Sequence, residues 1–449
     1  MAAVNLVQLS EAVAHNRFSA EFFDPRYVFE PVAGSEWAPI GRVLKKCEYG
    51  LSISMNSVGK GFPIFRMNEL DDCFALRPEK FANISQSEFN ASALQENDVL
   101  FNRTNSFEFV GRTGIVKDQT DCTFASYLIR LVPDAARLLP EFLTVYLNTP
   151  FGIGQIKRRA MRSINQANVS GSEVRKILIP LVDLSVQQEV ADLVNAAFSK
   201  QRDALSYFAT AQSFLETELG LDKLTFQKPV GYTAQLRNIE VSRRIDPEHY
   251  FPAFSAFCAA LPSGVALSPL ANHLDFCQRG KQPIYAKAGL PVINSKHVQP
   301  NRVIMEGNRF ALSNPVDDLQ IRSGDTLING TGRGTIGRAA PYLNVTPAVA
   351  DNHVTILRSN SLDPAYLSLY LNSAAGQMQV EMHQRGSSGQ LELYPFDIRK
   401  FLVWPAPTGL QRELRELYDK ATAAEQESRR LLDQAKACVE QLIKAAVQP

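Results

Sequence analysis

The amino-acid sequence predicts an α+β fold in which two tandem globules, each β-rich with short helices, are each followed by a long helix. Three observations predict this organisation. Landmark residues of the first half of the 449-residue chain recur in the second half in the same order. Short runs of strand-forming residues, separated by Gly, Pro, Asn and Ser, fill most of each half. A long stretch with apolar residues at helical spacing then closes each half.

The composition is that of a soluble globular protein. Hydrophobic residues make up 45% of the chain and charged residues 21%, which excludes a disordered or collagen-like chain. No stretch approaches the ~20 apolar residues of a membrane span, and the first ten residues lack the layout of a signal peptide. The six scattered cysteines form no C-x-x-C pair, so we expect no structural zinc and a cytoplasmic location. Lys and Arg total 47 against 46 Asp and Glu, so any nucleic-acid surface must be a local patch.

Six paired landmarks, offset by about 222 to 230 positions, define the repeat. In chain order they are Asp24-Pro25 with Asp246-Pro247, Cys47–Gly50 with Cys277–Gly280, Gly61–Pro63 with Gly289–Pro291, Asn97–Thr104 with Gly324–Thr331, Pro140–Asn148 with Pro364–Asn372, and Val174–Ile179 with Ile398–Val403. The second, third and fourth pairs lie among turn residues. A chance match would not keep this order, so we interpret the chain as a tandem duplication.

The elements of each globule follow from local composition. Strands are expected at Asp98–Phe101, Ser126–Val132, Thr326–Asn329 and Val354–Arg358, and short helices at Pro140–Asn148 and Pro364–Asn372. The predicted boundaries are 1–182 for the first globule, 183–220 for its long helix, 221–240 for a linker, 241–406 for the second globule and 407–449 for the second long helix.

The long helices are predicted by periodic apolar residues. The first should run from about Val186 to Leu219. The second has a heptad-like stripe, interrupted at Ser428, that consists of Leu410, Leu414, Leu417, Ala421, Ala424, Leu431, Ala435, Cys438, Leu442 and Ala445. At ~1.5 Å per residue each helix spans on the order of 50 Å. Antiparallel pairing of the two helices as a coiled coil would hold the globules at a fixed separation; alternatively, each helix lies on its own globule.

This organisation resembles the DNA-specificity subunit of type I restriction–modification enzymes. The residues that carry the resemblance are Gly50–Ser52 with Gly61–Asn68, Gly280–Gln282 with Gly289–Asn294, the stretch Gly324–Arg338, and the helix start Ile179–Leu181 with Gln187–Glu189. The resemblance covers nearly the whole chain. The second helix departs from the pattern, because its opening turn Trp404–Pro407 is irregular.

The resemblance implies a non-catalytic, cytoplasmic subunit of a phage-defence complex, without cofactor or metal. Each globule would be a target-recognition domain that reads one half of a bipartite site in double-stranded DNA. The helices would act as a ruler and as the docking surface for two methyltransferase subunits, which carry the chemistry, and motor–nuclease restriction subunits are a further partner in the family. A ruler of fixed length sets the spacing between half-sites. The docking candidates are Val190, Leu193, Leu414, Leu417, Leu431 and Leu442.

The DNA-binding candidates are cationic and amide residues gathered in predicted loops. Arginine binds guanine bidentately, asparagine binds adenine, and lysine and serine often bind phosphates. The first globule offers Lys60, Asn102, Arg103, Thr104, Asn105, Arg112, Lys157, Arg158, Arg159, Arg162 and Asn165. The second offers Lys281, Lys296, Asn329, Thr331, Arg333, Arg338, Arg385, Ser387 and Ser388. The alternative interpretation is a pair of Gly/Asn-rich turns capped by Asp98 and Asp325, beside a solvated helix face.

Enzymatic interpretations find little support in the sequence. The run Gly332–Gly337 satisfies G-x-G-x-x-G, but Arg338 and Ala339 do not supply the Lys and Ser/Thr of a P-loop. Asn148–Phe151 resembles an amino-methyltransferase motif with the wrong middle residue. We therefore nominate no catalytic residue. Two alternatives to the specificity subunit stay open: the recognition subunit of another methylation-linked phage-defence system, and a stand-alone DNA methyltransferase or nuclease.

Overall fold

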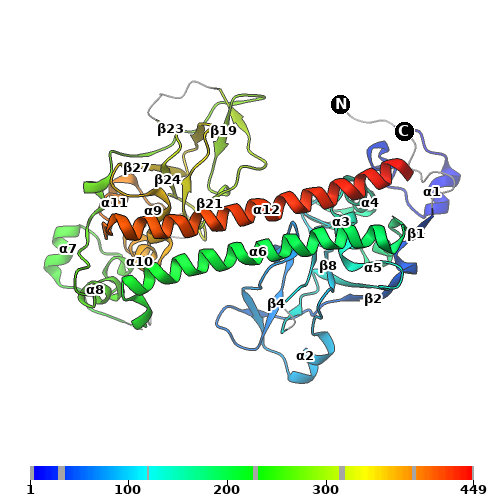
Figure 1. The fold of residues 1–449 in the computed structure, drawn as a ribbon, viewed down its shortest axis with the longest axis horizontal. Coiled ribbons are helices and arrows are strands. Elements are labelled where there is room, and N and C mark those ends of the chain that lie inside the picture. Colours follow the sequence, from blue (N-terminus) through cyan, green and yellow to red (C-terminus); the bar gives the residue numbers. More distant parts are fainter. Residues whose placement is uncertain are drawn as a thin grey trace. The chain divides into compact units, whose positions relative to one another are not determined.

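The computed structural model describes residues 5–28, 36–118, 121–225, 231–312, 319–386 and 391–446. The chain forms a mixed α+β fold and divides into two compact units (Figure 1). Unit 1 consists of Met1–Arg202 and Ala424–Pro449, and unit 2 of Asp203–Ala423. No helix in the described part of the chain is long and apolar enough to cross a bilayer.

A six-stranded sheet forms the centre of unit 1, in the order β2-β12-β8-β10-β6-β5. Its strands are β2 (Leu44–Tyr49), β12 (Leu128–Pro133), β8 (Val99–Asn102), β10 (Thr113–Ile115), β6 (Cys73–Ala75) and β5 (Leu70–Asp71). The described part of unit 1 has three further sheets. The first has the strand order β11 (Thr123–Phe124), β4 (Phe62–Phe65), β7 (Lys80–Ala82) and β3 (Met55–Asn56). The second has the order β13 (Met161–Arg162), β14 (Ala167–Asn168) and β9 (Thr104–Asn105), and the third is the pair β1 (Trp37–Pro39) and β15 (Leu178–Pro180). The helices are α1 (Leu9–His15), α2 (Gln86–Ser92), α3 (Pro140–Leu147), α4 (Pro150–Arg159) and α5 (Gly171–Val174).

Unit 2 repeats the central strand order as β17-β27-β24-β25. These strands are β17 (Phe276–Arg279), β27 (Val354–Arg358), β24 (Asp325–Asn329) and β25 (Ala339–Tyr342). The others are β18 (Tyr285–Ala286), β22 (Phe310–Ala311), β19 (Leu290–Ile293), β26 (Ala348–Ala350) and β23 (Gln320–Ile321), with the pairs β20 (Val298–Gln299) and β21 (Arg302–Val303), and β16 (Ser268–Pro269) and β28 (Leu402–Val403). The helices are α7 (Leu236–Ser242), α8 (Ala253–Ala259), α9 (Pro364–Asn372), α10 (Ala374–His383) and α11 (Pro395–Ile398).

The predicted strands and short helices are confirmed with boundary shifts of at most two residues. Each unit buries nearly all of one short helix, α3 or α9, against its central sheet. The tyrosines of these helices anchor the exit strand: the hydroxyl of Tyr146 donates to the Leu178 carbonyl, and that of Tyr370 to the Leu402 carbonyl at 2.9 Å. The same fold element therefore positions the polypeptide that leaves each globule.

The first landmark pair is wrong by five residues. A seven-residue helix ends at a left-handed residue in both units, Asn16 after α1 and Arg243 after α7. The next residue is an arginine that donates to the carbonyl at the end of α4 or α10: Arg17 to Arg159, and Arg244 to His383. Arg17 therefore fills the position of Arg244, which is five residues off the match of Asp24-Pro25 with Asp246-Pro247, although each of these dipeptides also begins a 3-10 helix.

Two long helices each contribute residues to both units: α6 (Leu184–Glu218) and α12 (Thr408–Ala446). Within unit 1, Val190, Val194 and Ala197 of α6 share an apolar cluster with Leu432, Ala435, Val439 and Ile443 of α12. Within unit 2, Ala211, Leu215 and Leu219 of α6 lie in a cluster with Leu414 of α12. Phe208 and Tyr418 meet edge to face, with ring centres 5.6 Å apart. In each unit the helix segments thus bury apolar residues in that unit's own core.

The buried stripe of α12 differs from the predicted one in its C-terminal half. Cys438 is exposed, while Val439 next to it is fully buried. The stripe shifts at Ser428, which is buried because its hydroxyl donates to the Ala197 carbonyl at 2.8 Å. A straight helix has 3.6 residues per turn, so a strict heptad drifts off the contact line, and a four-residue step at a small polar residue restores it.

Candidate nucleic-acid interface

The candidate surface of unit 1 is organised around Arg103, directly after β8. Its guanidinium lies 4.9 Å from the ring centre of Tyr49 and donates to the side-chain oxygen of Asn168 at 3.1 Å. Asn168 in turn donates to the hydroxyl of Thr104 at 2.7 Å. Half-buried Arg103 is therefore held by strands β2, β9 and β14 in one orientation.

Lys157 of α4 fixes the loop that carries Arg112. Its ammonium group donates to the carbonyls of Phe107, Glu108 and Val110, and it is 8% exposed. Burial lowers the pKa of Lys157 to about 8. Because three carbonyl oxygens surround it, Lys157 stabilises the loop from inside.

Two exposed arginines lie on the aromatic rings of this loop. The guanidinium of Arg112 lies 4.3 Å from the ring centre of Phe109, and that of Arg162 lies 3.3 Å from the ring centre of Phe107. Stacking on a ring restricts a long side chain while its donor groups stay in water. Both arginines are consequently presented for contact with an anionic partner.

The other candidates of unit 1 differ in exposure. Asn102 is fully buried and donates to the Phe109 carbonyl, and Thr104 is 7% exposed. Arg158 donates to the Phe22 carbonyl and Arg159 to the Lys176 carbonyl, and burial lowers the pKa of Arg159 to about 10. Lys60 and Asn165 are exposed, and Asn105 is half-buried.

Unit 2 has a related but different arrangement. Asn329 is fully buried and donates to the carbonyls of Ser295 and Val298 at 3.0 and 3.1 Å, as Asn102 does to a carbonyl in unit 1. The hydroxyl of Thr331 lies 2.7 Å from Nδ1 of His353. Arg338 donates to the side-chain oxygen of Gln299 at 2.7 Å.

The remaining candidates of unit 2 differ in exposure. Arg333, Lys281 and Lys296 are exposed, and Arg385 is half-buried and paired with Asp397. Ser387 and Ser388 lie outside the described residues. No group of three or more His, Cys, Asp or Glu side chains that could hold a metal ion occurs in the described part of the chain.

No protein-family model matches the chain. The type I restriction enzyme EcoKI specificity subunit of Escherichia coli K12 is 29% identical over 163 residues, which is 35% of this chain and 34% of that protein. The putative type I restriction enzyme MjaX specificity subunit of Methanocaldococcus jannaschii is 26% identical over 157 residues, 34% of this chain and 37% of that protein. Over about a third of its length, this chain is similar in sequence to type I restriction specificity subunits.

The similarity spans about a third of the length of these curated specificity subunits. Among solved structures, the HsdS subunit from Thermoanaerobacter tengcongensis aligns with 93% of this chain at 15% identity and a TM-score of 0.31. The type I restriction–modification S subunit from M. genitalium aligns with 93% of the chain at 12% identity and a TM-score of 0.40.

Sequence reasoning missed three residues that organise these candidate surfaces. Arg17 and Arg244 link the N-terminal arm of each unit, which consists of residues 16–27 in unit 1 and 243–250 in unit 2, to the end of α4 or α10. Arg279 donates to the carbonyls of Gly330 and Leu393 and pairs with Glu392 at 3.1 Å. The other landmark pairs are offset by 224 to 230 positions, and an offset of 227 within this range would have matched Arg17 with Arg244. Nothing in the sequence indicated the role of Arg279, because the residue at the matching position of the first half is Tyr49 and not an arginine.

Proposed function

We propose that this chain is the DNA-specificity subunit of a type I restriction–modification enzyme. In this proposal it carries no catalytic site, acts in the cytoplasm, and reads a bipartite target in double-stranded DNA. The observation that carries the proposal is the sequence similarity to two specificity subunits. The stacked, exposed arginines of unit 1 and the exposed cations of unit 2 support it, because they suit the phosphates and guanine edges of DNA.

Each unit, in this proposal, is a target-recognition domain for one half-site. The contact residues in unit 1 are the exposed or half-buried Lys60, Arg103, Asn105, Arg112, Arg158, Arg159, Arg162 and Asn165. Those in unit 2 are Lys281, Lys296, Thr331, Arg333, Arg338 and Arg385, together with Ser387 and Ser388. Asn102, Thr104, Lys157 and Asn329 are left out, because a buried side chain bonded within its own loop cannot reach DNA without unfolding that loop.

The helices α6 and α12 are proposed to form an antiparallel coiled coil that acts as a ruler between the half-sites. Two methyltransferase subunits would dock on it, through surface that includes the half-buried Leu193, Leu417, Leu431 and Leu442. Val190 and Leu414 are left out, because they are 1% and 0% exposed and pack inside the cores of their units. Motor–nuclease subunits would join this complex for restriction. Apolar clusters that α6 and α12 share in each unit support the pairing.

The test is a methylome obtained by single-molecule sequencing. The chain is co-expressed with the methyltransferase encoded beside its gene, in a host without DNA methylation, and the methyltransferase alone is the control. We expect a split motif with a fixed gap that depends on this chain. A stable complex that leaves DNA unmethylated would contradict the proposal and favour another defence assembly. Methylation at a continuous motif would contradict the reading of two half-sites.

A further inference from the structure

Unit 2 contains a cavity of about 970 Å³ whose charged lining is dominated by arginine. Four arginines line it, namely Arg243, Arg244, Arg333 and Arg385, against the two carboxylates Asp246 and Glu248. They come from three separate segments: the arm after α7, the glycine-rich loop after β24, and the chain after α10. Convergence of cations from distant segments in one cavity is electrostatically costly unless an anion is bound there.

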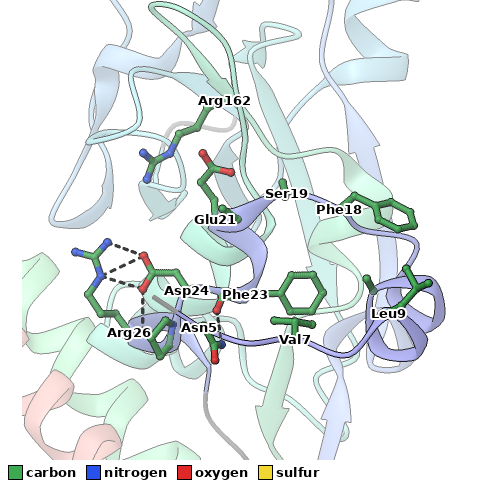
Figure 2. A pocket seen from close by; sticks show the side chains of 13 residues that line it. Asn5, Val7, Leu9, Phe18, Ser19, Glu21, Phe23, Asp24, Arg26 and Arg162 are labelled. Atoms are coloured by element: carbon green, nitrogen blue, oxygen red, sulfur yellow. Dashed lines mark hydrogen bonds and ion pairs between the residues drawn. The ribbon is translucent and has the colours of Figure 1, made fainter. Parts of the chain in front are cut away.

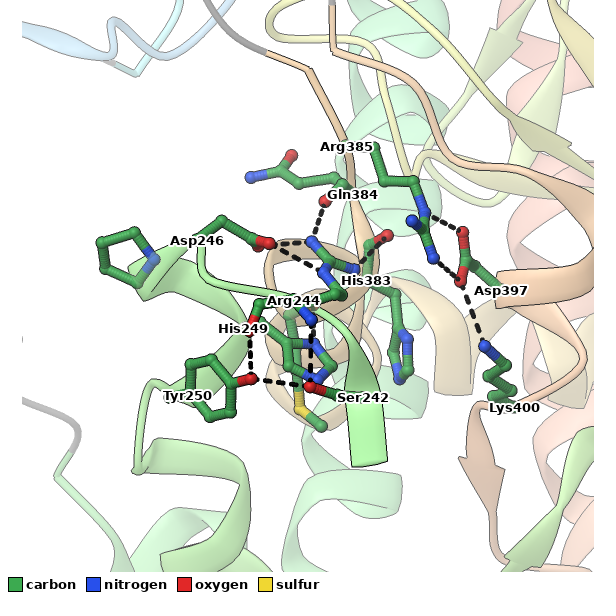
Figure 3. A network of polar contacts seen from close by, with 12 residues as sticks. Ser242, Arg244, Asp246, His249, Tyr250, His383, Gln384, Arg385, Asp397 and Lys400 are labelled. Carbon is green, nitrogen blue, oxygen red and sulfur yellow. Dashed lines mark hydrogen bonds and ion pairs between the residues drawn. The ribbon is translucent and has the colours of Figure 1, made fainter. Parts of the chain in front are cut away.

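The two inner arginines form a fixed wall. Arg244 is 6% exposed and donates to the carbonyls of His383 and Gln384 at 3.2 and 2.6 Å, besides its ion pair with Asp246. Arg385 donates to Asp397 at 2.8 Å. Figure 3 shows Arg244 between Asp246 and Gln384, with Arg385 turned toward Asp397. The charges of the inner arginines are thus balanced by carboxylates.

The two outer arginines are exposed, and their charges are not balanced in this way. Arg243 occupies a left-handed conformation at the end of α7, and Arg333 lies between Gly332 and Gly334, which both have positive φ. Among the residues that the structure describes, neither arginine makes an ion pair or a side-chain hydrogen bond. The cavity therefore has a surplus of positive charge at its rim.

Unit 1 has a cavity of about 720 Å³ at the corresponding place, between its N-terminal arm and β13. This cavity is lined by two arginines, Arg26 and Arg162, and by two carboxylates, Glu21 and Asp24. Figure 2 shows Arg26 directed at Asp24, with apolar Phe18 and Leu9 on the other side of the view, beyond Phe23. Arg26 holds the pKa of Asp24 near 2 by a hydrogen bond. The surplus of positive charge is therefore particular to unit 2.

We propose that the arginine-lined cavity of unit 2 binds the phosphate backbone of duplex DNA, and that it adds salt-dependent, sequence-independent affinity that the cavity of unit 1 does not add. The proposal rests on the DNA-binding function proposed above. Arg243 and Arg333 contact the phosphates, while Arg244 holds the segment that carries Arg243 against the end of α10 and Arg385 is paired with Asp397. Each arginine that neutralises a phosphate releases a counterion, and so adds about 0.9 to the slope of log affinity against log salt concentration.

The test is DNA binding by the full chain as a function of salt, with a duplex of about 30 base pairs and random sequence, so that the target need not be known. The test variant combines Arg243→Gln with Arg333→Gln. The control combines Arg26→Gln with Arg430→Gln, which removes the same charge from two exposed arginines that are paired with Asp24 and Glu427. Circular dichroism checks that both variants are folded.

We expect the test variant to lower the salt slope by about 2, so that the loss of affinity between 50 and 200 mM salt shrinks roughly tenfold. The control should keep the slope of the unmodified chain. An unchanged slope in the test variant would overturn the inference and leave the DNA-binding function standing, as would an equal drop in both variants. If the unmodified chain bound no DNA at any salt concentration, the proposed function would fail and the inference with it.

Discussion

The guanidinium of Arg103 lies on the ring of Tyr49 in unit 1, 4.9 Å from its centre. In unit 2 the arginine comes from the opposite strand: Arg279 occupies the position of Tyr49, and Gly330 the position of Arg103. A Cβ added at Gly330 would lie 2.9 Å from Nη2 of Arg279. Each unit therefore keeps one guanidinium at this place but supplies it from a different strand, and a side chain at Gly330 would crowd the guanidinium of Arg279 and the Leu393 carbonyl.

Gly330→Arg should destabilise unit 2 by about 2 kcal/mol or more, because two guanidinium groups cannot share the space and the charge environment of one. Adding Arg279→Tyr recreates the residue pair of unit 1 and should recover part of that loss. The measurement is the Tm of the two variants and of Arg279→Tyr alone. A double variant that is no more stable than Gly330→Arg would contradict the inference that Arg279 takes the place of Arg103 in unit 2.

The sequence predicted regular elements well, because local composition decides them. Val354–Arg358 and Pro364–Asn372 were predicted with the bounds that the structure has, and the first long helix was predicted within two residues at its start and one at its end. Strand-forming runs between turn residues need no knowledge of the partner strand. The repeat was also visible, since each landmark marks a turn or the end of an element.

Side-chain direction at the candidate surface could not be predicted from sequence. Asn102 and Lys157 belong to clusters of polar residues that are typical of a DNA surface, yet both face inward to carbonyls of the loop around Glu108. The burial of Lys157 depends on a loop about fifty positions earlier in the chain. A periodicity within one segment carries no information about such a contact.

The shifted stripe of α12 predicts opposite effects at two neighbouring positions. Val439→Asp places a carboxylate in the apolar cluster of unit 1 and should cost about 3 kcal/mol or more. Cys438→Asp, one residue earlier, places the same group on an exposed position and should leave stability nearly unchanged. The measurement is urea denaturation followed by circular dichroism. Equal effects, or the larger effect at Cys438, would support the predicted heptad stripe instead.

Lys157 should make stability depend on pH in the alkaline range. Burial lowers its pKa from 10.5 to about 8, so between these pH values the unfolded chain binds more protons at this residue than the folded chain does. Stability of the unmodified chain should therefore rise with pH across this window, relative to Lys157→Met, which cannot titrate. Urea denaturation of both proteins at pH 7.5, 9 and 10.5 measures the difference. A difference that stays constant would show that Lys157 keeps its ordinary pKa.

Arg17 should stabilise unit 1 far more than Arg26, although both belong to the same N-terminal arm. Arg17 is 15% exposed in its side chain, donates to the Arg159 carbonyl at 2.8 Å and pairs with Glu173 at 3.3 Å. Arg17→Met would leave the Arg159 carbonyl without its charged donor and Glu173 paired with Lys176, at a cost of about 1.5–3 kcal/mol.

Arg26→Met is the matched control for this substitution, because the side chain of Arg26 is 68% exposed and its pair with Asp24 lies in water. We expect a lower Tm for Arg17→Met and an unchanged Tm for Arg26→Met. Hydrogen exchange should also quicken at the end of α4 in the first variant only, because Arg17 ties the arm to that helix end. Similar behaviour of the two variants would mean that the arm is held by its apolar residues, such as Phe22 and Phe23, and not by this arginine.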